Sequence, residues 1–259
     1  MRKIVLLRDA GYLFSSDAAM IALGLLGQII LTHSLPTAEY GSWVIVIDLL
    51  GILFLLVHFG IPDVLGRDAP RIGSRIARIL KFYTTYQLAT ALVFGPIVIM
   101  ILLTFLSLGL SLYTTIFLSI SVASQLLGAT YRMILRSLGE ARTEGFLRIL
   151  DRGLVITGYL INYSFLGGSI EVFAIATAIG PFSTLPLAIW KSRSLLAGIP
   201  TAEKSSVSEE DFSRRELLFR ALPFFITSGL LLVINRVDKL VLLYFTGPDA
   251  ILDAISDVR

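Results

Sequence analysis

The sequence predicts an all-α integral membrane protein, a polytopic helical bundle of about seven transmembrane helices. Three observations predict this fold class. The chain is 55% hydrophobic and only 16% charged, whereas soluble domains carry about 25% charged residues. Its apolar residues form long runs instead of the narrow stripes of amphipathic helices. Its Lys and Arg residues gather in polar stretches that alternate with connections containing neither residue.

Seven apolar stretches are long enough to cross a bilayer, which takes about 20 mostly apolar residues. Backbone polar groups inside lipid must bond to one another, so each stretch is predicted to be a helix. The fifth is the weakest because charged residues lie on its first turns, where long Arg side chains can reach back to the membrane surface. The stretches are 10–34, 42–62, 82–106, 110–131, 153–167 with a lead-in from Phe146, 170–190 and 219–245.

Nineteen of the 22 Lys and Arg residues lie in four polar stretches, while the connections 35–41, 107–111 and 167–169 carry none. Positive charge is retained on the cytoplasmic side during insertion. We therefore expect a multi-pass protein of the plasma membrane with a cytoplasmic N-terminus. Cations that flank apolar spans fit attraction to anionic membrane lipids, and they form no basic face for nucleic acid. The charged residues on the first turns of the fifth span are Arg148, Asp151 and Arg152.

A long polar segment at 191–218 divides the chain. Residues 1–190 hold six spans and are predicted to form an N-terminal six-helix lobe. The segment itself is predicted to be a cytoplasmic linker with a short amphipathic helix, which starts at Ser208 before three acidic residues and runs toward Pro223. Residues 219–259 are predicted to hold the first helix of a second, truncated lobe.

Several kinds of site are excluded or unsupported by the residues present. The chain has no Cys, which excludes disulfides, thiolate catalysis and Cys-ligated metals. His33 and His58 have no partner at a metal-ligand spacing. A Gly-rich phosphate loop and the common hydrolase motifs are missing. We therefore expect no catalytic residue, no metal and no cofactor.

The strongest cluster of polar residues within a span is formed by Asn235, Arg236, Asp238 and Lys239. A charged residue at the centre of a span costs about 2.5–3.5 kcal/mol on insertion scales, so such residues usually face a cavity or a partner. One interpretation is the wall of a central cavity, where Arg236 and Lys239 bind phosphate through their donors. The alternative is that the helix ends near Leu232 and the cluster lies at the outer interface.

A second polar stripe lies in the first span. Asp17, Gly24 and Gln28 are spaced at i, i+7 and i+11, which places them on one narrow face of a helix. The stripe either lines the same cavity from the other lobe or forms interhelical hydrogen bonds at an interface of small residues. Asp48 in the second span is closer to Arg236 in membrane depth, so it joins the candidate cavity residues.

Five short motifs follow one another along the chain. They are LPTAEYGSW at 35–43, FGIPDVLGR at 59–67, LPFF at 222–225, DKLVL at 238–242 and FTGPDA at 245–250. Their order resembles that in oligosaccharide flippases, also called polysaccharide biosynthesis transporters. The superfamily also holds multidrug extruders and peptidoglycan-precursor flippases.

The resemblance implies a transporter that flips a lipid-linked oligosaccharide from the cytoplasmic to the outer leaflet by alternating access. Members of the family usually have twelve or more spans in two lobes, so it also implies a C-terminal half missing from this chain. Two alternatives remain. A multidrug or cation antiporter on the same fold would have mainly acidic cavity residues. A membrane-embedded glycosyltransferase or acyltransferase would need a catalytic loop, for which Asp63 and Asp68 are the candidates.

The predicted orientation can be tested because the chain contains no Cys. In intact cells, an impermeant thiol reagent should label Thr37→Cys, in an outer connection, and should not label Ser206→Cys, in the cytoplasmic linker. The measurement is labelling of each variant before and after the cells are opened. Labelling of Ser206→Cys alone in intact cells would reverse the orientation.

Overall fold

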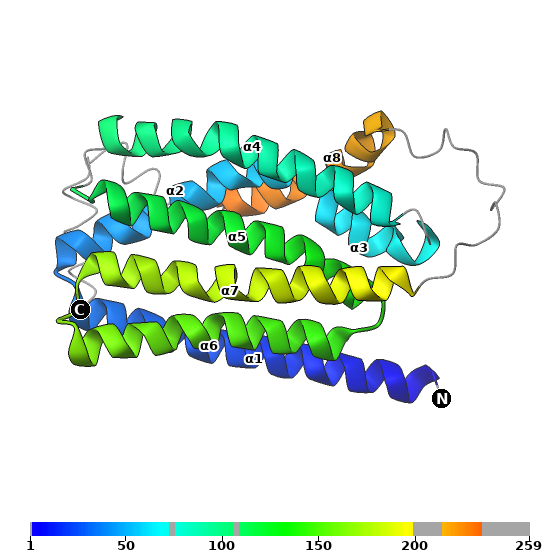
Figure 1. Cartoon of the computed structure of the whole chain (residues 1–259), viewed down its shortest axis with the longest axis horizontal. Coiled ribbons are helices and arrows are strands. Elements are labelled where there is room, and N and C mark those ends of the chain that lie inside the picture. The colour runs from blue at the N-terminus through cyan, green and yellow to red at the C-terminus, as the bar shows by residue number, and fades with distance from the viewer. Residues whose placement is uncertain (1, 73–75, 106–108, 199–213, 235–259) are drawn as a thin grey trace.

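The computed structural model describes residues 2–72, 76–105, 109–198 and 214–234 (Figure 1). Within these ranges every regular element is a helix. The helices are α1 (Arg2–Ser34), α2 (Thr37–His58), α3 (Ile61–Ile72), α4 (Ile76–Phe105), α5 (Leu112–Ser137), α6 (Ala141–Phe165), α7 (Ile170–Ala197) and α8 (Arg214–Ile234).

The long helices lie side by side along the longest axis of the molecule, and consecutive ones run in opposite directions (Figure 1). Helices α1, α4 and α6 end, and α2, α5 and α7 begin, at the same end of the bundle. By length and composition, three described segments are apolar enough to cross a membrane: Gly11–Ser34, Leu112–Ser137 and Ile170–Ala197. The prediction of an all-α polytopic membrane bundle is confirmed.

The outer surface of the bundle carries large apolar side chains. Phe14 is 76% exposed, Leu92 80% and Phe165 81%. Soluble monomers rarely expose apolar surface of this extent. In a membrane bundle these side chains lie against lipid tails.

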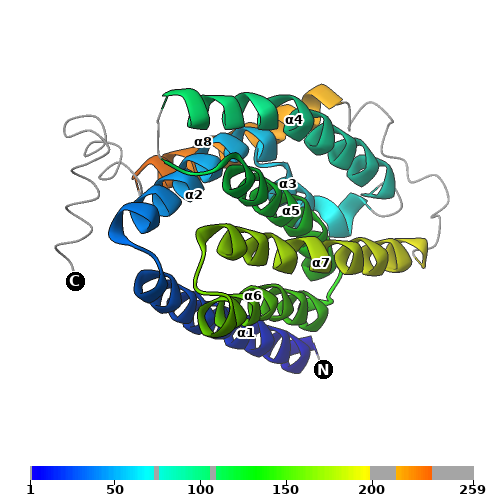
Figure 2. The same cartoon turned by 60° about the vertical axis from the view of Figure 1, so that its left-hand side comes forward.

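The largest buried cluster lies between α1, α2, α5, α6 and α7. Trp43, Leu118 and Phe173 are almost fully buried in it, and the Tyr159 and Phe173 rings meet edge to face with centroids 5.1 Å apart. Figure 2 shows α6 beside α1, with α7 between this pair and α5. This part of the bundle contains the polar site described below.

The predicted second span, 42–62, begins and ends too late along the chain. Helix α2 ends at His58, and the chain turns at Phe59 and Gly60, which have φ angles of 45° and 65°. Both residues are in the left-handed region, which stops a right-handed helix. Helix α3 then starts at Ile61 as a separate, strongly amphipathic helix.

Helix α8 is continuous where the sequence suggested two helices, because Pro223 does not end it. The predicted boundary at 218/219 therefore falls inside one helix. This helix packs on α2 and α3. The Phe59 and Phe225 rings stack with centroids 4.7 Å apart, and the Arg67 guanidinium lies 5.3 Å from the centre of the Phe224 ring.

Gly60 in the α2–α3 turn lies directly against the backbone of α8. A Cβ at this position would lie 2.7 Å from the backbone nitrogen of Phe225, and its φ of 65° is strained for other residues. We expect Gly60→Ala to destabilise the protein by about 1–3 kcal/mol and to loosen α8. Thermal unfolding in detergent measures the loss.

Gly51→Ala is the matched control, since a Cβ on this glycine of α2 meets nothing within 4 Å. It should leave stability unchanged or raise it, because Ala favours a helix over Gly. Equal stability of the two variants would show that α8 does not depend on this contact.

Candidate functional site

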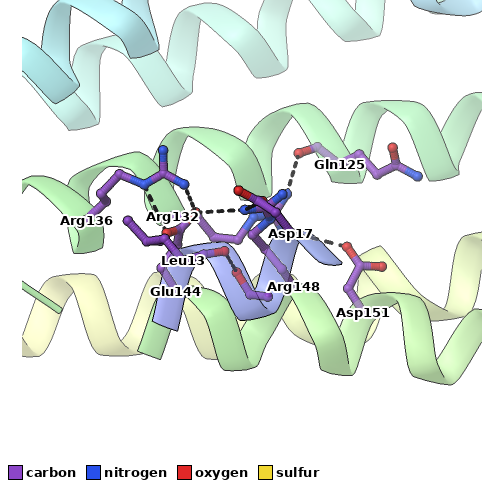
Figure 3. Close-up of polar contacts among 9 residues, drawn as sticks. Leu13, Asp17, Gln125, Arg132, Arg136, Glu144, Arg148 and Asp151 are labelled. Carbon is purple, nitrogen blue, oxygen red and sulfur yellow. Dashed lines mark hydrogen bonds and ion pairs between the residues drawn. The ribbon is translucent and has the colours of Figure 1, made fainter. Parts of the chain in front are cut away.

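A row of charged side chains joins α1, α5 and α6 (Figure 3). Its most buried member is Glu144 of α6, whose side chain is 6% exposed. Arg136 of α5 binds it with two hydrogen bonds, from Nε at 3.0 Å and from Nη2 at 2.8 Å. Paired bonds between a guanidinium and a carboxylate fix both distance and orientation, so this contact fixes the start of α6 against α5.

The second pair joins α6 to α1. Arg148 Nη1 lies 2.6 Å from Asp17 Oδ1 and 3.9 Å from Glu144 Oε1. The two helices come close because Gly145 has no side chain: a Cβ there would lie 3.2 Å from the Cβ of Ser16. Asp17, one of the predicted cavity residues, therefore takes part in an ion pair at an interface of small residues.

The third pair again joins α5 and α6. Arg132 Nη1 lies 3.7 Å from Asp151 Oδ2, and Arg132 Nη2 donates to the backbone oxygen of Gln125 at 3.5 Å. The sequence suggested that the long Arg side chains at the start of the fifth span reach back to the membrane surface. In the structure Arg148 pairs with Asp17 of α1, and Asp151 pairs with Arg132 of α5. Helix α6 accordingly begins at Ala141, earlier than the predicted span.

A cavity of about 190 Å³ lies beside this row of ion pairs, between α1, α2, α5, α6 and α7. Its described polar lining consists of amides, hydroxyls and one guanidinium, and its described lining contains no carboxylate. These polar residues are Gln28, Ser121, Gln125, Arg152, Tyr159 and Thr177. The apolar lining includes Leu31, Trp43 and Ile156.

Arg152 supplies the only charge in the described lining of the cavity. Its Nε is buried and has no hydrogen-bond partner in the described part of the chain. One of its terminal nitrogens, Nη2, lies 3.8 Å from where a Cβ on Gly24 would be. The sequence noted Arg152 only as a weakness of the fifth span. The available signal was its position four residues after Arg148, on the same face of a helix.

The predicted residues of the first lobe are only partly brought together. Gln28 lines the cavity, and its Oε1 accepts a 2.8 Å hydrogen bond from the Tyr40 hydroxyl. Gly24 lines the cavity as well, whereas Asp17 and the half-buried Asp48 are not part of its described lining. The cluster of Asn235, Arg236, Asp238 and Lys239 lies outside the described residues.

Of the two residues named for an enzymatic alternative, Asp63 has a described side chain. Asp63 is half-buried at the start of α3, and burial raises the pKa of its carboxyl. Among the described residues no group of three His, Cys, Asp or Glu side chains is placed to hold a metal. The side chain of Asp68 lies outside the described part.

Sequence comparison identifies no relative: no protein-family profile and no curated protein matches the chain. Solved structures do match its fold, each at 18% sequence identity. A MOP superfamily transporter from Pyrococcus furiosus, whose binding pocket is described as having reversed polarity, aligns with a TM-score of 0.60 over 88% of this chain. An outward-facing multidrug resistance MATE transporter aligns with 0.64 over 95%, and a MATE in complex with MaD3S with 0.61 over 94%.

These likenesses establish the fold. The described helices adopt the arrangement of part of a MOP superfamily transporter. The chain spans just over half the length of these proteins, between 52% and 57% of each.

The ion pairs of this row should contribute unequally to the stability of the protein. Glu144→Gln removes a buried charge that two arginines share, and we expect it to cost about 1–3 kcal/mol. Asp17→Asn removes a carboxylate whose side chain is 53% exposed, so it should cost less than about 1 kcal/mol. Both changes remove one negative charge with little change of shape, and unfolding in detergent compares them. If Asp17→Asn lowers the free energy of unfolding as much as Glu144→Gln does, the main stabilising contact lies at the α1–α6 interface.

Proposed function

We propose that this chain is part of a membrane transporter that flips a lipid-linked oligosaccharide to the outer leaflet by alternating access. The proposal rests on three supports. The sequence motifs resemble those of polysaccharide flippases. The fold is shared with MOP superfamily transporters. The charge in the interior of the bundle favours an anionic cargo.

The charge of the bundle interior is the observation that favours an anionic cargo over a cationic drug. The fold is compatible with multidrug extrusion as well, since a multidrug resistance MATE transporter shares it. A binding site for cationic drugs needs acidic groups that are available to the drug. In the described cavity the only charged side chain is Arg152. The nearby acids Asp17, Glu144 and Asp151 are each paired with an arginine.

The physical problem of flipping is the transfer of a large polar head group through an apolar layer. A cavity between two lobes, open to each side in turn, keeps the sugar away from lipid tails. We propose that Arg236 and Lys239 neutralise the phosphate linkage there, with Asn235 and Asp238 beside them. Gln28, Asp17 and Asp48 would contribute from the first lobe, and a C-terminal half would complete the second lobe.

The test is Arg236→Ala in cells that make the protein in its natural context. Outer-leaflet exposure of the lipid-linked sugar should be lost while the amount of protein in the membrane is unchanged. Arg236→Lys should recover part of the activity, because an ammonium replaces a fork of donors. Arg193→Ala, which removes an exposed cation of α7, is the matched control.

Two results would contradict the proposal. Normal flipping by Arg236→Ala would remove this residue from the cargo site. Unchanged sugar exposure in cells without the protein, together with increased sensitivity to cationic drugs, would identify an exporter.

A further inference from the structure

We infer that the cavity beside α1 and α6 is a binding site for a small inorganic anion, held by the Arg152 guanidinium. The site is formed by the N-terminal helices alone, and it shares Gln28 with the residues proposed to contribute to cargo binding from the first lobe. It goes beyond the proposed function, because it requires no oligosaccharide and no second lobe.

The first argument is the unpaired charge. Burying an ionised group without a partner costs several kcal/mol, and the other arginines of this region avoid the cost through Glu144, Asp17 and Asp151. Arg152 makes no hydrogen bond or ion pair with any described residue, although its Nε is fully buried. The adjacent carboxylate, Asp151, is already paired with Arg132 at 3.7 Å. An anion in the cavity would supply the missing negative charge.

The second argument is the set of donors around the guanidinium. The Gln28 Oε1 atom accepts from Tyr40, which leaves the Gln28 NH₂ group able to donate. Gln125 Nε2 reaches Ser121 Oγ only at 3.4 Å, a weak bond that an anion can replace. The described lining offers no carboxylate to repel an anion. Its polar groups therefore favour a negative ligand over a cation.

The third argument is size. The cavity of about 190 Å³ is smaller than the ligand pockets of drug-sized molecules, which measure about 300–1,000 Å³. It is too small for an oligosaccharide head group. A halide or a phosphate ion fits together with a few waters, since each water occupies about 30 Å³ in the liquid. The volume and the single cation together indicate a small inorganic anion.

A tryptophan within the lining makes the site measurable. The chain has two Trp residues, and Trp43 lines the cavity while being only 1% exposed. Trp190 lies on the outer surface of α7, so Trp190→Phe leaves Trp43 as the sole reporter. Iodide quenches tryptophan fluorescence and serves as the probe anion, with chloride and phosphate as competitors. The protein is the full 259-residue chain in detergent, freed of lipid.

We expect iodide to quench Trp43 along a saturable curve that chloride shifts to higher iodide concentration. Arg152→Gln should lose the saturable part, and Arg152→Lys should keep it with roughly tenfold weaker binding. Arg193→Gln, an exposed arginine of α7, should behave as the parent protein. Linear, unsaturable quenching in the parent protein would overturn the inference.

Gly24 allows a second test that keeps Arg152 in place. A Cβ at Gly24 meets nothing closer than Arg152 Nη2 at 3.8 Å, so Gly24→Asp sets a carboxylate against the guanidinium. This internal anion should abolish saturable quenching. It should also raise the unfolding temperature at low salt and remove the stabilisation by chloride that we expect in the parent protein. Gly24→Ala adds the carbon without the charge and should keep both responses.

The outcomes separate the possible ligands. Saturable iodide quenching that survives Gly24→Asp would overturn the assignment of the site to Arg152. Displacement of iodide by vesicles of anionic phospholipid, with no displacement by chloride or phosphate, would overturn a free inorganic anion in favour of a lipid head group. Loss of sugar flipping in Arg236→Ala leaves the anion site intact, so the two proposals fail independently.

Discussion

The charges at the start of α6 must be neutralised within the bundle, and the arrangement of the surrounding helices depends on how this is done. Glu144, Arg148 and Asp151 lie on three successive turns of α6. Their partners come from α5 on one side and from α1 on the other. A helix with these charges cannot face lipid without a large cost. The pairs therefore join α6 to both α1 and α5, as Figure 3 shows for the residues involved.

The ion pairs form only because small residues let the helices approach. Gly145 meets Ser16 of α1, and a Cβ at Gly27 would lie 2.8 Å from the side chain of Ile156 on α6. On the other side of α6, a Cβ at Gly158 would lie 2.7 Å from Ala176 of α7. Close backbone approach is the usual way in which membrane helices pack without a hydrophobic driving force. Packing and electrostatics therefore support each other in this part of the bundle.

The sequence predicted the features that depend on residues close together in the chain. The length of each apolar stretch predicted a helix, and turn residues such as Gly167 and Gly168 indicated where a helix ends. The partners were not predictable, since Asp17 and Arg148 are far apart in the chain and their spacing carries no signal. The end of α2 was missed because Phe59, which is not glycine, has a φ of 45°. Arg152 was interpreted from the sequence only as a charge that weakens the fifth span, and its role depends on helices that one sequence cannot place in space.

Arg152 also connects the cavity to the row of ion pairs. Asp151 interacts electrostatically with both Arg132 and Arg152, so an anion beside Arg152 changes the charge balance around Asp151. With the cavity empty, Asp151 faces two cations; with an anion bound, Arg152 is neutralised and Asp151 pairs with Arg132 alone. Anion binding as proposed would therefore alter the α5–α6 contact. For the proposed alternating-access transporter, this would be a direct physical route from ion binding to helix packing.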